Sequence, residues 1–209
     1  SGQSVDQMIS ELSSESLAEE NGLLLAIPEG IDGGWNDEDP PGAEFADDVG
    51  FIDALVTELK GIYPSLQASQ VFAHGFSNGG GLATRLACES SHVRGVGVIG
   101  NYYMPLFEDC PRPTGSVVPG WFGAGLDDEL VRVESVREGM AYYSADLTDC
   151  EGTGSLDPGE ATGMGEGILC KKVSGCDLVR LCEYPDRGHE MLPGSLEAAW
   201  RFLNEAVEP

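Results

Sequence analysis

The chain has 209 residues and a mass of 22.1 kDa, which suits one domain with a hydrophobic core and leaves little room for two. Apolar residues make up 41% of it, which excludes a disordered protein, and no apolar run approaches the ~18 residues of a membrane span. The 36 acidic residues outnumber the 11 basic ones, giving a net charge of −25 at pH 7. Because such a chain repels phosphate and anionic lipid, we expect neither nucleic acid nor a membrane surface as a partner.

Helical and extended patterns alternate along the chain from its start. Apolar residues at helical spacing predict a helix over residues 4–20, which Asn21 and Gly22 end in the manner of a helix stop. The short apolar run at 23–27 predicts a buried strand. A second helical stripe predicts an amphipathic helix over about 44–60.

The rest of the chain continues this alternation. We predict strands at 71–73, 93–99, 121–124, 168–173 and 178–184, and helices at 82–88, about 130–145 and 196–207. The Gly-rich, acidic stretch 148–167 is predicted to be a surface excursion. This order favours a single α/β domain over residues 1–209, with a mostly parallel sheet and helices on both faces. In such a sheet, functional groups lie beyond the carboxyl ends of the strands.

Six cysteines in a chain this short and acidic favour an oxidising compartment, so we expect a secreted protein with disulfide bonds. Cys88 ends a predicted helix and Cys110 follows the next strand, so a bridge between them is reasonable. The alternative to disulfide bonds is six buried free thiols in a cytosolic protein.

The other four cysteines are sorted by strand geometry. If residues 177–182 are extended, Cys176 and Cys182 lie ~20 Å apart, beyond the ~7 Å reach of a disulfide. Cys170 and Cys182 can face each other across a hairpin, which leaves Cys150 with Cys176. The spacing of these cysteines does not match a zinc site.

The sharpest local motif is G-F-S-N-G at 75–79. It follows a predicted strand and opens a predicted helix, which is the setting of a nucleophile elbow. The turn would expose the Ser77 hydroxyl at the helix N-terminus, where the dipole favours developing negative charge. The backbone N–H of the next residue, Asn78, would then serve as an oxyanion donor. The alternative is that Ser77 only caps a helix in a Gly-rich turn.

A serine nucleophile needs a base, and the sequence offers three histidines. His74 precedes the elbow, so its ring should point away from the exposed side of Ser77. His92 lies in a polar link after a helix, where we expect it to be solvated. His189 follows the last predicted strand, at the same sheet rim as Ser77, and elimination makes it the candidate base.

The third member of a triad would be an acid that orients the histidine. Asp127, Asp128 and Glu129 follow the strand at 121–124, again at a carboxyl end. Position alone does not separate these three acids.

The chain as a whole resembles a known family. It is similar to the secreted α/β-hydrolase esterases that include polyhydroxybutyrate depolymerases, feruloyl esterases and acetyl xylan esterases. The resemblance rests on five segments that occur in the family's order: G-W-N at 34–36, D-D-V-G-F-I at 47–52, G-F-S-N-G-G at 75–80, G-L-D-D-E-L-V at 125–131 and G-H-E at 188–190.

The resemblance implies an α/β-hydrolase fold and a serine esterase with the triad Ser77, Asp128 and His189. The family's acid loop, G-x-x-D followed by a hydrophobic pair, puts the acid on Asp128, with Asp127 as the fallback. The 47–48 acid pair is expected to cap and anchor the second helix. No metal or organic cofactor is implied, and the G-V-G-V-I-G run at 95–100 lies inside a strand, unlike a dinucleotide fingerprint.

The resemblance also implies a departure. The family's second oxyanion donor comes from a Gly loop after a strand, and this chain starts just past that loop. In the family's sheet that strand lies between the strands expected here at 23–27 and 71–73, so we expect a sheet that lacks its first strands. We consider, in this order, an upstream segment, a separate chain that completes the sheet, and an inactive relative.

The residues and the resemblance together predict a secreted serine esterase that cleaves polyester or plant cell-wall acyl esters. Trp35 and Tyr102 are candidate walls of its substrate pocket, although buried aromatic packing is the competing interpretation. The alternative function is a catalytically inactive relative that binds a polymer or a protein partner, and a thioester or amide hydrolase would use the same triad.

Overall fold

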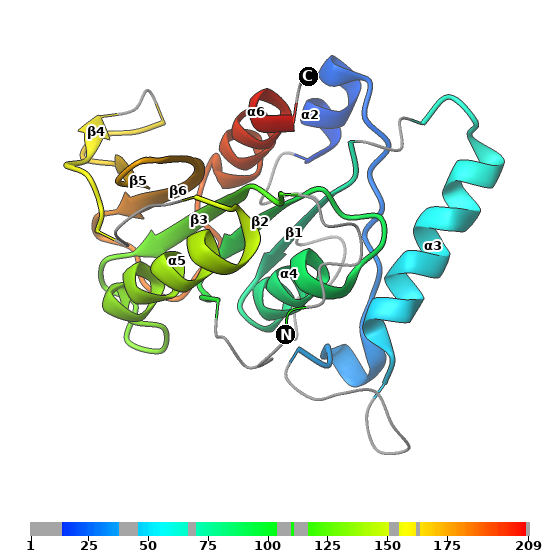
Figure 1. The fold of residues 1–209 in the computed structure, drawn as a ribbon, viewed down its shortest axis with the longest axis horizontal. Helices are drawn as coiled ribbons and strands as arrows, with labels where there is room; N and C mark the ends of the chain where they lie inside the picture. The colour runs from blue at the N-terminus through cyan, green and yellow to red at the C-terminus, as the bar shows by residue number, and fades with distance from the viewer. Residues whose placement is uncertain are drawn as a thin grey trace.

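The computed structural model describes residues 14–37, 46–66, 70–103, 110, 117–150, 155–161 and 164–207. Within these ranges six strands form one sheet in the order β1-β2-β3-β6-β5-β4. The three pairings from β1 to β6 are parallel, and the β6-β5-β4 edge is antiparallel (Figure 1). The strands are β1 (Phe72–Phe76), β2 (Gly95–Ile99), β3 (Gly120–Gly125), β4 (Glu160–Ala161), β5 (Leu169–Val173) and β6 (Cys176–Tyr184).

Helices cover both faces of the sheet, as predicted (Figure 1). Because side chains alternate along a strand, Val98 and Phe122 pack with the α4 and α5 face, whereas Ile99 and Trp121 pack with α6. The helices are α2 (Ser14–Asn21), the 3-10 turn η1 (Ile31–Gly33), α3 (Asp48–Ile62), α4 (Asn78–Glu89), α5 (Val133–Leu147) and α6 (Ser195–Val207).

The second helix, predicted over about 44–60, spans Asp48–Ile62, so it begins later than predicted. Asp47 is the N-cap of α3, and its carboxylate accepts a hydrogen bond from the Gly50 N–H at 2.9 Å. Asp48 is buried, and its carboxylate accepts a bond from the Asn36 N–H at 2.6 Å. The expected capping and anchoring roles are confirmed. Residues 4–13 of the first predicted helix lie outside the described residues, and the remainder of the prediction corresponds to α2.

The three predicted disulfides are present. They join Cys88 to Cys110, Cys150 to Cys176 and Cys170 to Cys182. The third crosses the β5-β6 hairpin at directly paired positions, which is the geometry that the hairpin argument required.

The predicted strand at 23–27 is wrong. This segment joins no sheet, and Leu23, Leu24 and Leu25 are 37%, 42% and 42% exposed. The apolar side chains of this run match those of a buried strand. A strand also needs a neighbouring backbone to bond with, and none of the described residues supplies one here.

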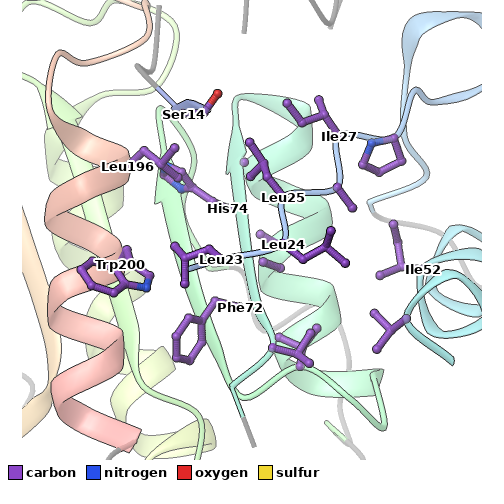
Figure 2. A pocket seen from close by; sticks show the side chains of 18 of the residues that line it. Ser14, Leu23, Leu24, Leu25, Ile27, Ile52, Phe72, His74, Leu196 and Trp200 are labelled. Atoms are coloured by element: carbon purple, nitrogen blue, oxygen red, sulfur yellow. The ribbon is translucent and has the colours of Figure 1, made fainter. Parts of the chain in front are cut away.

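A cavity of about 790 Å³ separates this segment from β1. Figure 2 shows Leu23, Leu24 and Leu25 of the segment near Phe72 and His74 of β1, between α6 with Trp200 and α3 with Ile52. Most of the residues that line the cavity are apolar. The cavity therefore lies along the open edge of the parallel sheet.

The backbone direction of β1 follows from its bonds to β2. The Ser77 N–H donates to the Ile99 carbonyl at 2.8 Å. Since alternate residues of a parallel strand bond to the same neighbour, Phe72, His74 and Phe76 direct their N–H and C=O groups away from β2. Among the described strands β1 pairs with β2 alone, so these groups face the cavity.

This edge can be tested by amide hydrogen exchange on the purified 209-residue chain. We expect the Phe72, His74 and Phe76 amides to exchange faster than those of Ala73 and Gly75, which face β2. Residue-resolved exchange by NMR measures the contrast. Equal protection of both sets would mean that another backbone occupies the edge, which would contradict this description.

An ion-pair cluster joins α5 to the antiparallel edge of the sheet. Glu183 on β6 is buried, and its carboxylate lies 2.8 Å from Arg137 Nε and 2.7 Å from Lys171 Nζ. Burial alone would raise the pKa of Glu183, but the bonds to the two cations outweigh burial and hold the pKa below its ordinary value of 4.5.

A carboxyl group whose pKa is lowered by folding stabilises the fold above its unfolded pKa and loses that effect as the pH falls. We therefore expect Glu183→Gln to lower the free energy of unfolding by about 1–3 kcal/mol at pH 7. The difference from the wild type should shrink once the pH falls below 4.5, which thermal melts of dilute protein at several pH values measure. A difference that is absent at pH 7, or that grows in acid, would contradict this account of the cluster.

Candidate active site

The G-F-S-N-G segment forms a sharp turn between β1 and α4. Ser77 has φ 53° and ψ −123°, a strained backbone conformation for a residue with a side chain. The turn is tight because Gly75 and Gly79 touch: any side chain at position 75 would overlap the Gly79 carbonyl. The strand–turn–helix setting predicted for the elbow is therefore present, and the carbonyl of Ser77 accepts a bond from the Gly81 N–H at 3.1 Å.

One imidazole connects the three residues that the sequence singled out. His189 Nε2 lies 2.9 Å from Ser77 Oγ, and His189 Nδ1 lies 2.8 Å from Asp128 Oδ2. Because an ionised carboxylate only accepts, a neutral ring donates Nδ1–H to Asp128 and accepts the hydroxyl proton of Ser77 at Nε2. The Phe76 ring lies against the imidazole, with centroids 4.9 Å apart.

The acid loop separates the candidate carboxylates. Asp128 is 5% exposed, and its other oxygen accepts bonds from the N–H groups of Leu130 and Val131 at 2.9 and 2.8 Å. Asp127 and Glu129 are exposed. Of the three acids left open by position, the structure brings Asp128 to the histidine.

The acid loop and the histidine loop are tied to each other. The Leu126 N–H donates to the Tyr184 carbonyl, and the Asp127 N–H donates to the Arg187 carbonyl, both at 2.9 Å. Gly125 permits this approach, because a side chain there would overlap the Arg187 carbonyl. The two loops therefore carry Asp128 and His189 as one unit at the carboxyl ends of β3 and β6.

The other two histidines lie elsewhere. His74 Nδ1 is 2.8 Å from the Gly97 carbonyl, and the ring lines the cavity beside β1 (Figure 2). Burial is the largest influence on the pKa of His74 and lowers it, so the ring is held neutral. His92 is not simply solvated as expected: its Nε2 lies 3.0 Å from Thr57 Oγ1 on α3, and its Nδ1 lies 3.4 Å from Lys60 Nζ.

The two candidate pocket walls have different surroundings. Trp35 is half-buried, stacks on Phe51 with ring centroids 6.5 Å apart, and lies beside Gly79 of the elbow. Tyr102 is half-buried and packs against the core under α4 and α5. Both side chains therefore pack against other residues, as the interpretation that competed with substrate binding expected.

Sequence reasoning missed two asparagine side chains at the elbow. Asn101 Nδ2 donates to the Ser77 carbonyl at 2.7 Å. The side-chain amide of Asn78 bonds to both backbone groups of Trp35. The available signal for Asn101 was its place just past the carboxyl end of β2, on the rim that carries the triad candidates.

No metal-binding group is visible in the part of the chain that the structure describes, where no three His, Cys, Asp or Glu side chains gather suitably. None of the helices in the described ranges is long and apolar enough to cross a membrane.

Comparison with known proteins shows what the whole chain is similar to. No family model matches the chain. It is 28% identical over 201 residues to feruloyl esterase C of Emericella nidulans, covering 92% of this chain and 68% of that protein. It is also 28% identical over 211 residues to a probable feruloyl esterase C of Aspergillus terreus, with the same coverage.

A solved structure gives the fold. Acetyl xylan esterase from Aspergillus awamori superposes with a TM-score of 0.72 over 93% of this chain and 82% of its own, at 14% identity. The chain is an esterase of the α/β-hydrolase fold. The fold class and the esterase class predicted from the sequence are thereby confirmed.

The acid assignment in this esterase can be tested by a matched pair of substitutions. Asp128→Asn should lower kcat for p-nitrophenyl acetate by about 10³- to 10⁴-fold, because the amide no longer fixes the required histidine tautomer. Asp127→Asn removes the same charge one residue away and should change kcat less than about threefold. Comparable losses in both variants would contradict the assignment of Asp128.

Proposed function

We propose that this esterase is a serine hydrolase that forms an acyl-enzyme on Ser77, with His189 as general base and acid and Asp128 as the group that orients it. The observation that carries the proposal is the imidazole bridge, 2.9 Å to the Ser77 hydroxyl and 2.8 Å to the Asp128 carboxylate. A serine hydroxyl is a weak nucleophile alone, and this arrangement supplies the adjacent base it needs.

Acylation follows from these contacts. Ser77 Oγ bonds to the ester carbonyl carbon while its proton passes to His189 Nε2, and the carbonyl electron pair moves onto oxygen. The imidazolium that forms is stabilised by Asp128. When the tetrahedral adduct collapses, the carbon–oxygen bond to the alcohol breaks and Nε2 returns the proton to the departing oxygen. Water repeats the sequence on the acyl-enzyme, releasing the acid and restoring the Ser77 hydroxyl.

The oxyanion is proposed to bind at the start of α4. Asn78 is the first residue of that helix, so its N–H is not used by the preceding turn and the helix dipole favours negative charge there. One lost oxyanion donor costs about 10²–10³ in rate in other hydrolases, so a second donor matters. The resemblance implies that this second donor comes from a Gly loop, which in the family follows the strand beside the one that carries the nucleophile.

We propose that a polypeptide strand from outside residues 1–209 pairs with β1 and fills the cavity. The outward backbone of Phe72, His74 and Phe76 and the apolar lining support it. The resemblance favours an N-terminal segment over a separate chain as its source. Protein isolated from its native source should then protect these three amides, and mass spectrometry should detect the added polypeptide. Unprotected amides in that material would contradict the strand.

The substrates proposed are acyl esters of plant cell-wall polymers or of polyesters. The names of the feruloyl esterase relatives favour hydroxycinnamoyl esters among these. Trp35, beside Gly79 of the elbow, is the proposed aromatic wall, with Tyr102 as a second candidate. Three disulfides support a secreted protein that folds in an oxidising compartment.

A serine-reactive fluorophosphonate probe tests the proposal. The wild type, prepared together with the strand that pairs with β1, should take up one equivalent, and Ser77→Ala in the same preparation should take up none and lose hydrolysis of p-nitrophenyl acetate and methyl ferulate. Ser174→Ala, in the β5-β6 turn, is the matched control and should behave as the wild type. Labelling that survives in Ser77→Ala, or a folded wild type that is neither labelled nor active, would refute the proposal and favour the binding-protein alternative.

A further inference from the structure

The side-chain amide of Asn78 is fully engaged by the loop that carries Trp35. Its Oδ1 accepts from the Trp35 N–H at 2.7 Å, and its Nδ2 donates to the Trp35 carbonyl at 2.9 Å and to Asp37 Oδ1 at 2.7 Å. A backbone N–H can only donate and a carbonyl or carboxylate can only accept, so the orientation of the amide is fixed by its partners.

The loop does not depend on Asn78 for its own position. Asn36 makes other hydrogen bonds. Its N–H donates to Asp48 at the start of α3, and its side-chain amide donates to the Ala46 carbonyl at 2.9 Å. The carbonyl of Asn36 accepts from Arg85 Nη1 at 3.0 Å. Arg85 is itself buried and paired with Glu89. The loop is therefore anchored to α3 and α4 at other points and acts as a fixed support.

The contact with Asp37 is the most specific part of this arrangement. The Asp37 carboxylate reaches the first turn of α4, where a side chain at Gly81 would overlap it. The helix dipole stabilises the negative charge of Asp37 at this N-terminus. The carboxylate also accepts a hydrogen bond from the side-chain amide of Asn78, the residue that follows Ser77. A carboxylate at position 78 would instead face Asp37 with like charge.

We propose that the Asn78 side chain, held by Asp37 and the Trp35 backbone, is a positioning group that fixes the Asn78 N–H at the oxyanion position. This inference rests on the proposed acyl-enzyme function and adds to it a role for two side chains that do not touch the reacting atoms. Because a displacement of about 1 Å can cost about 10² in rate, its loss should appear mainly in kcat.

A swap of the two side chains tests the pair. Asn78→Asp should lower kcat for p-nitrophenyl acetate by about 10- to 100-fold and change KM less than about threefold. Asp37→Asn alone keeps an acceptor for Asn78 and should lose less. The double variant D37N/N78D restores a donor opposite an acceptor between positions 37 and 78, although not at the Trp35 carbonyl, and should recover at least about fivefold in kcat over Asn78→Asp.

Asn21→Asp is the matched control, because the Asn21 amide donates to the Leu17 carbonyl at 2.9 Å on an exposed helix end away from the site. It should leave kcat unchanged. An unaltered kcat in Asn78→Asp, a change confined to KM, or no recovery in D37N/N78D would each overturn the inference. If Asn78→Asp does not fold, a folded and active D37N/N78D still supports the pair, and an unfolded one overturns it.

The fluorophosphonate reaction distinguishes failure of the Asn78 positioning role from failure of the proposed serine hydrolase function. If the wild type is labelled at Ser77 but Asn78→Asp is labelled at the same rate, the positioning role is wrong and the serine hydrolase stands. If the wild type is not labelled at all, the proposed function is wrong and the positioning role falls with it.

Discussion

The site depends on one imidazole, that of His189, which contacts both the hydroxyl and the carboxylate. Ser77 comes from the end of β1, Asp128 from the loop after β3 and His189 from the loop after β6, so no local segment holds them together. Parallel strands deliver all three to the same rim, and the backbone bonds between the acid and histidine loops set their relative height. The strained turn at Ser77 then brings the hydroxyl up to the ring, at a backbone cost that the two packed glycines make tolerable.

The same strand that carries the nucleophile is the weakest edge of the sheet. β1 has β2 on one side and an apolar cavity on the other, and its outward backbone groups have no partner among the described strands. Two asparagines support the turn from other directions, Asn101 through the Ser77 carbonyl and Asn78 through the Trp35 loop. The elbow is therefore braced by a side chain at the end of β2 and by the loop that carries Trp35.

Much of this arrangement could be predicted, for identifiable reasons. The β1–turn–α4 unit follows from glycines that tolerate backbone contact. The Cys170–Cys182 disulfide follows from hairpin geometry, and it leaves Cys150 to pair with Cys176. Asp128 needed the family's loop pattern, because burial of one acid among three neighbours is decided by the fold rather than by spacing. The strand at 23–27 was wrong because an apolar run reports burial and not a backbone partner. The Asn78 contacts join residues 43 positions apart, which no local pattern encodes.

The protonation state of His189 tests the central claim most directly. In ¹⁵N-labelled protein at neutral pH, the account expects a proton on Nδ1, shared with Asp128, and an unprotonated Nε2 whose signal shifts when the Ser77 hydroxyl is removed. A ring protonated on Nε2, or one whose two nitrogens are indifferent to both neighbours, would show that the imidazole does not connect the hydroxyl to the carboxylate in solution.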